Sequence, residues 1–507
     1  MTVIIDGSPL SIADVVAVAH RRADVELGSE LAARMTPALD VVRSAVAGNE
    51  TVYGVTTGFG ALATTFCPPD QVAQLQVDLL RSHAGAVGDL LDPIVVRSML
   101  LLRARTLSQG HSGVRPEIVE FLIELLQRDL LPAVPSQGSV GASGDLAQFA
   151  HLALPVIGEG HLLVDGEQVP SAEVLSDAGI EPLTLEPKEG LSLLNGTEGM
   201  LARGCLAVDR ARRLADAADA ACALSVEALL ASNVPLDPRI HALRPHPGQV
   251  HSAETMAGLL EGSEIVASHR DDMTHAVQDA YSLRCAPQVH GAVRDSIDHA
   301  ATVFGRELGA VVDNPIVFPD DGDVISGGNF HGQPLAIALD LLAIAVTELG
   351  TISERRTDRI LDPQHSSGLT PFLAHQPGVE SGYMLAQYTA ASLVAESRIL
   401  AHPASIDSIP TSGSQEDHVS MGWGAARKLD SILDNIARVL AIELICAAEG
   451  TEQRAPLSPA AGTAAVLSAV RSEVAPLDGD RSFSGDIEAM ALLISDGGLD
   501  HIVHSEE

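Results

Sequence analysis

Aromatic side chains are scarce in this 507-residue chain: Phe, Trp and Tyr together make up 3% of the residues. A core built mainly on large rings is therefore excluded, and aliphatic side chains must fill it. Stretches rich in Ala and Leu carry apolar residues at helical spacing, and we expect helices over residues 206–231, 334–349 and 432–448. The composition predicts a mainly α fold of long, closely packed helices.

Basic residues are also few, with 31 Lys and Arg against 67 Asp and Glu and a formal net charge of -36. Such an acidic surface repels the phosphates of nucleic acids and anionic membranes, so neither is an expected partner. No apolar run reaches the ~18 residues that span a bilayer. The first ten residues lack the basic-then-apolar pattern of a secretion signal. We expect a cytoplasmic protein.

Cysteines are too few and too scattered for a disulfide framework or a zinc site. There are five of them, and no two form a C-x-x-C pair: Cys67, Cys205, Cys222, Cys285 and Cys446. No metal is expected. Linkers, low-complexity runs and internal repeats are absent as well. We therefore expect an N-terminal lobe over residues 1–110 and an extended helical body over residues 111–507.

Small residues are concentrated in one run, GSVGASGDLA at residues 138–147, whose centre is Ala142-Ser143-Gly144. Glycine permits tight backbone turns, so the Gly144 nitrogen could reach the Ala142 carbonyl carbon. Cyclisation with loss of water, followed by dehydration of Ser143, would give a five-membered ring with an exocyclic methylidene. That group is an electrophile that no unmodified side chain provides, and it needs no external cofactor.

Other interpretations of this run are possible. A cluster of small residues before an Ala/Leu-rich stretch is typical of an ordinary turn ahead of a helix. A serine-hydrolase elbow requires glycine two residues after the serine, where this chain has Asp145. A phosphate-binding loop would continue with Gly-Lys-Ser or Gly-Lys-Thr, which is missing. The run alone leaves the ordinary turn and the ring precursor open.

Six segments, in this order, resemble the aromatic amino acid ammonia-lyase family: YGVTTGFG at 53–60, the run at 138–147, LNGT at 194–197, QDAYSLRCAPQ at 278–288, GNFHG at 328–332 and QEDHVSMG at 415–422. The resemblance implies a long-helix bundle of the ammonia-lyase/fumarase-aspartase type. It also implies that Ala142, Ser143 and Gly144 form a 4-methylidene-imidazole-5-one ring (MIO) autocatalytically. Such lyases are homotetramers whose active sites are each built from several subunits.

The resemblance implies a role for further residues. Tyr53 is the leading candidate for the base that removes the β-proton. The guanidinium of Arg284 suits the substrate carboxylate, because it can donate two parallel hydrogen bonds. Phe330 is expected to wall the ring pocket. The expected catalytic residues are Tyr53, Ala142, Ser143, Gly144, Tyr281 and Glu416, and the expected substrate-binding residues are His83, Asn195, Gln278, Arg284, Phe330 and Met384.

Three positions bear on the substrate. His83 matches the members that act on histidine, although those that act on tyrosine carry histidine there too. Glu416 is more telling, because a carboxylate can accept from an imidazole N–H but is an unpaired charge beside a phenyl ring. Met384 stands where lyases of phenylalanine and tyrosine tend to carry glutamate. We expect L-histidine as substrate and trans-urocanate and ammonia as products, which is the first step of histidine degradation.

Two alternatives remain: a tyrosine or phenylalanine ammonia-lyase or 2,3-aminomutase that uses the same electrophile, and a catalytically inactive helical scaffold protein. The residues do not distinguish attack on the electrophile by the substrate amine from attack by its imidazole. One departure from the family pattern is Gln148-Phe149, where proline and leucine are usual.

Overall fold

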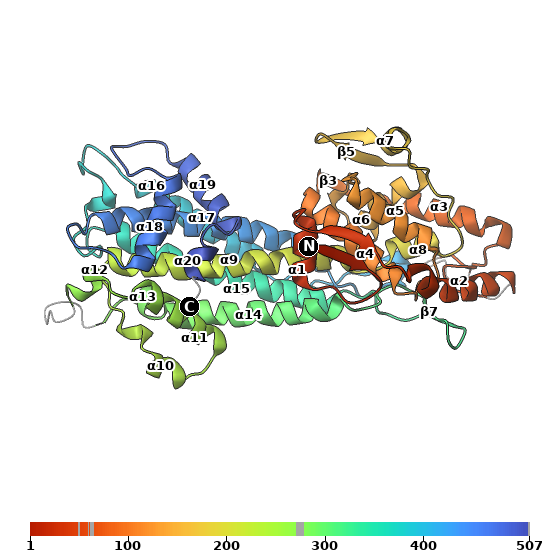
Figure 1. Ribbon diagram of the computed structural model, residues 1–507, viewed down its shortest axis with the longest axis horizontal. Helices are drawn as coiled ribbons and strands as arrows, with labels where there is room; N and C mark the ends of the chain where they lie inside the picture. Colours follow the sequence, from red (N-terminus) through yellow and green to blue (C-terminus); the bar gives the residue numbers. More distant parts are fainter. Residues whose placement is uncertain (49–50, 59, 61–64, 270–277, 505–507) are drawn as a thin grey trace. The chain divides into compact units, whose positions relative to one another are not determined.

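The computed structural model describes residues 1–48, 51–58, 60, 65–269 and 278–504. Within them the fold is mainly helical, which confirms the predicted fold class (Figure 1). The chain divides into two compact units. Unit 1 consists of Met1–Leu206, Ala301–Leu339 and Pro403–Arg427, and unit 2 of Ala207–Ala300, Asp340–His402 and Lys428–Glu507. The lobe expected over residues 1–110 lies within unit 1, and its standing as a separate domain stays a prediction.

Unit 1 contains short helices and paired strands. Its helices are α1 (Ile12–Ala19), α2 (Leu31–Ala47), α3 (Val72–His83), α4 (Pro93–Ser108), α5 (Pro116–Gln127), α6 (Leu146–Ala153), α7 (Ser171–Ala178) and α8 (Glu189–Leu194). Strands β1 (Thr2–Ile5) and β2 (Asp24–Leu27) pair in parallel. The antiparallel pairs are β3 (Val87–Leu90) with β4 (Pro135–Gln137), β5 (His161–Val164) with β6 (Glu167–Pro170), and β7 (Ile316–Phe318) with β8 (Asp323–Ile325).

The chain passes between the two units at five points, and one of these boundaries, between His402 and Pro403, follows α16 (Met384–Leu400). The other four boundaries lie within long helices: α9 (Glu198–Ala228), α14 (Ala286–Glu307), α15 (Gln333–Leu361) and α17 (Gly422–Glu452). Three of them, α9, α15 and α17, confirm the helices expected from sequence. The remaining helices of unit 2 are α10 (Pro238–Ala242), α11 (Pro247–Leu259), α12 (Glu264–Ala267), α13 (Tyr281–Arg284), α16 (Met384–Leu400), α18 (Ala461–Glu473), α19 (Ser484–Ser495) and α20 (Asp500–Val503).

Buried polar residues tie the long helices together inside unit 2. Arg356 on α15 donates to both carboxylate oxygens of Glu443 on α17, at 2.5 and 2.8 Å. His290 on α14 hydrogen-bonds Asp219 on α9 at 2.7 Å. All four side chains are buried. Buried charges need such partners, so these pairs fix the relative register of the helices.

Helix α15 as a whole is long and apolar enough to cross a membrane by composition alone, although charged residues such as Asp340 interrupt its apolar sequence, so that the sequence predicts no uninterrupted run there. In this fold 72% of its most apolar window is buried inside the protein. A helix that is hydrophobic on most sides is also what the centre of a large helical core requires. We therefore interpret α15 as a core helix.

Helix α4 forms the centre of unit 1. Its residues from Val95 to Ser108 are all buried, including Arg97, Arg103 and Arg105. Each arginine donates to a carboxylate or to a backbone carbonyl, although Arg103 Nε and Arg105 Nη2 have no hydrogen-bond partner among the described residues. A helix buried on every side provides a fixed support for the loops packed against it.

Candidate active site

The 138–145 loop lies between β4 and α6 and is held by backbone hydrogen bonds on one side. The Gly196 N–H donates to the Ser143 carbonyl at 3.2 Å, and the Asp145 N–H donates to the Gly196 carbonyl at 2.9 Å. Gly144 has φ +79°, and a Cβ built on it would lie 1.7 Å from the Gly196 oxygen. Only glycine fits between the two segments at this position.

Other residues hold the beginning of the same loop. The Met421 N–H donates to the Val140 carbonyl at 2.9 Å, and the Ser420 hydroxyl donates to the Gly141 carbonyl at 3.2 Å. The Ser139 hydroxyl lies 3.3 Å from the Gly144 carbonyl. The loop is therefore fixed on both sides of Ala142, and the carbonyls of Ser143 and Gly144 are themselves held by hydrogen bonds. Within the described part of the chain, the Gly144 N–H has no backbone acceptor.

Asp145 follows the tripeptide and is fully buried. Its carboxyl accepts a hydrogen bond from the Met200 N–H at 2.7 Å and lies 3.3 Å from the Ser139 hydroxyl. Burial raises the pKa of Asp145 to about 7, although these two hydrogen bonds act in the opposite direction. The carboxyl can therefore exist in either protonation state near neutral pH.

A cavity of about 500 Å³ opens beside this loop, and all its lining residues belong to unit 1. Half of the residues expected at the site line it: Tyr53, His83, Ser143, Asn195, Phe330 and Glu416. They come from regions far apart in the chain. Ala142 and Gly144 flank Ser143 in the loop. The structure thus brings the expected electrophile, base and imidazole-binding groups to one cavity.

The phenol of Tyr53 lies in a turn anchored by buried neighbours. Its oxygen accepts a hydrogen bond from the Gly60 N–H at 3.1 Å. Val55, two residues on, is buried in a small core with Val42 and Val317. This hydrogen bond fixes the direction in which the phenolic oxygen points, as a group that must meet a substrate proton requires. Phe59, in the same segment, lies outside the described residues.

His83 ends α3, and its ring is fixed by the helix itself. Nδ1 lies 2.9 Å from the Leu79 carbonyl, which can only accept, so the proton is on Nδ1. Nε2 is then an acceptor. Burial lowers the pKa of His83, and the charge of Glu416 opposes this only in part. The imidazole is therefore neutral at neutral pH.

Glu416 is held by a narrow turn. The Thr411 hydroxyl donates to Glu416 Oε2 at 2.8 Å, and the backbones of the two residues form an antiparallel bridge. Ser412 also lines the cavity and has a positive φ of 47°. Neither Thr411 nor Ser412 was identified from the sequence. Their only signal was their position just before the QEDH segment.

Asn195 and Phe330 complete the expected set in this cavity. The Asn195 amide donates to the Asn314 carbonyl at 3.2 Å. Asn314, which also lines the cavity, is fixed in turn because its side-chain oxygen accepts from the Gly327 N–H at 2.7 Å. Asn314 was missed in the sequence, where it is one polar residue before a proline with no recognisable motif.

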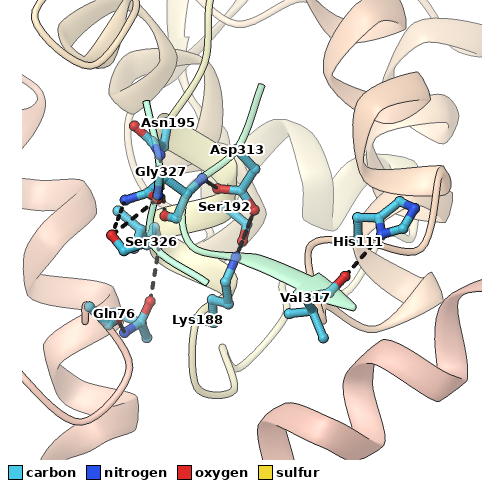
Figure 2. Close-up of polar contacts among 12 residues, drawn as sticks. Gln76, His111, Lys188, Ser192, Asn195, Asp313, Val317, Ser326 and Gly327 are labelled. Carbon is cyan, nitrogen blue, oxygen red and sulfur yellow. Dashed lines mark hydrogen bonds and ion pairs between the residues drawn. The ribbon is translucent and has the colours of Figure 1, made fainter. Parts of the chain in front are cut away.

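Buried groups behind the cavity connect its walls. Lys188 donates to Asp313 at 2.7 Å and to Ser192 at 2.9 Å, and Figure 2 shows the three side chains meeting. Gln76 on α3 donates to the Gly54 carbonyl at 3.3 Å and accepts from the Leu191 N–H at 3.1 Å. These bonds connect α8 to the segment before β7 that contains Asp313 and to the turn that contains Tyr53 and Gly54. None of these residues was singled out in the sequence.

The other expected residues lie in unit 2. Gln278, Tyr281 and Arg284 line a different cavity, of about 650 Å³, whose lining residues all belong to unit 2. The Tyr281 side chain is 71% exposed, and the Arg284 guanidinium lies over its ring at 4.8 Å. Arg284 Nε is buried and has no hydrogen-bond partner among the described residues. A buried, unpaired guanidinium N–H is suited to an anionic group of a ligand.

Met384 is the first residue of α16 in unit 2 and is partly buried. It lines neither of the two cavities described above. Within one chain, therefore, the structure groups the expected residues in two sets, one in each unit. The role of each residue stays a prediction.

Comparisons with known proteins identify relatives over nearly the whole chain. A family model described as aromatic amino acid lyase matches residues 10–472. The histidine ammonia-lyase of Gloeobacter violaceus is 51% identical, covering 98% of this chain and 96% of that protein. The protein of the same name from Symbiobacterium thermophilum is 52% identical, covering 97% of this chain and 96% of its own length.

Solved structures agree with these matches. The crystal structure of histidine ammonia-lyase from Trypanosoma cruzi has a TM-score of 0.91 and 42% identity, covering 100% of this chain and 95% of that chain. A tyrosine aminomutase from Streptomyces globisporus has a TM-score of 0.95 and 38% identity, covering 100% and 99% respectively. Fold similarity therefore extends to proteins with different named activities, and the substrate must be argued from the site.

Proposed function

This chain belongs to the aromatic amino acid lyase family, and from that premise we propose that it is a carbon–nitrogen lyase that eliminates ammonia from L-histidine to give trans-urocanate. The observation that carries the proposal is the single cavity in which the Ser143 loop, Tyr53, His83 and Glu416 meet. We place the reaction at the start of histidine degradation and in the cytoplasm, where the five free thiols would stay reduced.

The loop suits formation of the MIO ring, and this fit rests on its backbone contacts. Gly144 cannot carry a side chain, and its N–H has no backbone acceptor in the described structure, so its nitrogen is available to attack. Attack on the Ala142 carbonyl carbon releases one water, and Ser143 loses its hydroxyl and α-hydrogen as a second. The ring would supply the electrophile that activates the substrate for loss of ammonia.

Tyr53 acts in this proposal as the base that takes the β-proton. The Gly60 N–H holds its oxygen in place by a hydrogen bond at 3.1 Å. His83 and Glu416 bind the imidazole ring of the substrate. Neutral His83 offers Nε2 as an acceptor, and Glu416 offers the carboxylate oxygen that Thr411 leaves free. Phe330 closes the ring pocket. An uncharged phenyl ring has no N–H to donate to the second carboxylate oxygen of Glu416.

Arg284 binds the substrate carboxylate, with Gln278 and Tyr281 beside it. Support comes from the buried Nε of Arg284, which has no hydrogen-bond partner in the part of the chain that the structure describes, and from the exposed ring of Tyr281, which a partner chain could cover. These residues and Tyr53 line different cavities of one chain. We therefore propose a homotetramer in which each active site takes residues from more than one subunit.

Substrate and ring are tested in two measurements on the full-length protein. The protein is incubated separately with L-histidine, L-tyrosine and L-phenylalanine, and urocanate is followed by its near-ultraviolet absorbance. Intact-protein mass spectrometry is expected to show a loss of two waters from the sequence mass. The Ser143→Ala variant serves as control, because it cannot form the methylidene and should lack both signals.

Three results would contradict the proposal. Turnover of tyrosine alone would reassign the substrate, and a β-amino acid product without free ammonia would favour an aminomutase. An unmodified mass in a folded protein would favour an inactive scaffold.

A further inference from the structure

The ring of Phe149 lies against a buried arginine. The guanidinium carbon of Arg103 is 4.3 Å from the centroid of the Phe149 ring. Neither side chain is exposed to solvent. A cation over an aromatic face is attracted by the quadrupole of the ring, and most strongly when both groups are desolvated. Phenylalanine at 149 therefore supports Arg103 in a way that an aliphatic side chain such as leucine does not.

Arg103 directs its hydrogen bonds at the segment between α8 and α9. Nη1 donates to the carbonyls of Ser192 at 3.1 Å and Asn195 at 2.9 Å. Nη2 donates to Glu198 Oε2 at 2.7 Å. The side chains of Arg103 and Glu198 are 0% and 2% exposed. This single guanidinium thus holds the end of α8, the connecting segment and the first residue of α9.

Gly196 lies between this ion pair and the 138–145 loop. A Cβ on Gly196 would lie 2.3 Å from Glu198 Oε2 and 2.6 Å from Arg103 Nη2, so the pair packs directly against its backbone. The other side of Gly196 hydrogen-bonds Ser143 and Asp145. Gly196 therefore contacts Arg103 on one side and the 138–145 loop on the other, so a shift of Arg103 would also shift the loop.

We propose that Arg103, stacked on Phe149 and paired with Glu198, is a positioning residue for ring closure in the 138–145 loop. It fixes Gly196, and Gly196 holds Ser143 and Asp145 so that the Gly144 nitrogen faces the Ala142 carbonyl carbon. The inference rests on the ring proposed above. It concerns how fast this chain makes the ring, not how the finished site works.

The step that Arg103 assists is balanced within the chain. The Gly144 nitrogen forms a bond to the Ala142 carbonyl carbon, and the oxygen of that carbonyl leaves as water with one proton from the Gly144 nitrogen and one from the Ser143 nitrogen. Ser143 then loses its hydroxyl and its α-hydrogen as a second water. No oxidant, reductant or external reactant is required. The rate depends on how often the backbone reaches the compact geometry needed for attack.

Lysine cannot reproduce this arrangement. The planar guanidinium reaches two carbonyls and one carboxylate at once while one face lies on the Phe149 ring. An ammonium is a point charge on a flexible stem with no flat face to stack. The Arg103→Lys variant should therefore restore the function of Arg103 only in part.

The test follows ring formation by mass rather than by activity. Full-length protein is made by cell-free synthesis, translation is stopped, and the intact mass of the soluble, folded fraction is recorded over time. In the parent chain both waters are expected to be lost. In Arg103→Met the loss is expected to be about tenfold slower, with Arg103→Lys between the two. A residue with a merely structural role would change the yield of folded protein but not the rate of water loss in the folded fraction.

Arg105→Met is the matched control. Arg105 is on the same helix and is also buried, but it donates to the carbonyls of Ser8 and Ala310 and has no hydrogen bond to the loop. This variant is expected to lose both waters at the parental rate. Equal slowing in Arg105→Met and Arg103→Met would overturn the proposal, as would a parental rate in Arg103→Met.

If Arg103→Met does not accumulate as folded protein, the Phe149→Leu variant tests whether Arg103 positions the loop for ring closure. This milder change keeps an apolar core residue and is expected to slow water loss about threefold. An unchanged rate in Phe149→Leu would then overturn the proposal. If the parent chain itself keeps both waters, the proposal that Ala142-Ser143-Gly144 forms the ring is wrong. If the parent chain loses both waters and the variants lose them at the same rate, the ring proposal stands and the proposed positioning role of Arg103 is wrong.

Discussion

At the scale of single residues, Tyr53 has the contact that a phenolic base needs, because the Gly60 N–H donates to its oxygen at 3.1 Å. Tyr53→Phe removes the proton acceptor and leaves the ring-forming loop untouched. We expect kcat for L-histidine to fall by at least ~100-fold, in the range that loss of a general base causes. Absorbance of urocanate measures the rate, and intact mass should still show the loss of two waters.

A second tyrosine provides the control for this substitution. Tyr388 on α16 is 59% exposed and lines neither cavity. Tyr388→Phe removes the same hydroxyl elsewhere and should leave kcat within about twofold, as for most surface changes. Turnover of Tyr53→Phe close to that of Tyr388→Phe would remove Tyr53 from the mechanism.

Asp145 gives folding stability a pH dependence whose sign can be derived. Its pKa is about 7 in the folded chain, against an ordinary value of 3.8, because it is buried. Between these values the folded chain keeps a proton that the unfolded chain has released. The contribution of Asp145 to the free energy of unfolding is therefore largest below about pH 4 and decreases as the pH rises toward 7. Above pH 7 this contribution changes no further.

Asp145→Asn should remove this contribution, because an amide does not titrate. The free energy of unfolding is measured in urea at pH 5 and pH 8, with Ser143→Ala as the background for both chains so that the loop stays unprocessed. The difference between the two pH values is expected to be smaller in the Asp145→Asn chain than in the chain that keeps Asp145. An unchanged difference would show that Asp145 is not the titrating group.

At the scale of elements, the buried pair Lys188–Asp313 joins the start of α8 to the segment before β7 (Figure 2). Both side chains are 0% exposed. Lys188→Met leaves the buried Asp313 carboxylate without its countercharge, and should lower the free energy of unfolding by about 3–5 kcal/mol. The double variant Lys188→Met/Asp313→Leu should lose clearly less than the sum of the two single variants. Additive losses in urea unfolding would show that the two residues do not stabilise the fold as a pair.

Long elements could be predicted from the sequence because their signal is local. Ala and Leu repeats indicated α9, α15 and α17, although α9 ends at Ala228 and not at residue 231. Leu230 has a positive φ of 51°, and this backbone conformation ends the helix. A leucine in the sequence gives no sign of such a conformation. Strands of three or four residues, such as β7, are too short to give a clear alternating pattern.

The site was predictable only where a motif marks it. Ser143 and Asn195 lie in recognisable segments and do line one cavity with Tyr53. Lys188 and Arg103 were missed, because their partners lie 125 and 95 residues further along the chain. A buried ion pair between distant residues leaves no trace in local composition. Arg103 also lies in a helix whose other residues are mostly apolar, where nothing indicates that it faces Gly196.

At the scale of the whole molecule, the expected site residues are divided between two cavities of one chain. Tyr53 lines the cavity in unit 1 and Arg284 the cavity in unit 2. If each active site takes these residues from different subunits, two inactive variants should complement each other. Tyr53→Phe and Arg284→Met chains, each inactive alone, are co-expressed with different affinity tags, and oligomers that carry both tags are isolated.

Random mixing places a chain with intact Tyr53 and a neighbour with intact Arg284 together in about a quarter of the sites. Mixed oligomers should therefore recover about a quarter of the parental urocanate rate, whereas separately purified variants mixed without subunit exchange should stay inactive. A site built from one chain always carries one of the two substitutions and cannot recover. Absence of activity in folded, doubly tagged oligomers would therefore assign both residues to the same chain and exclude shared sites for this pair.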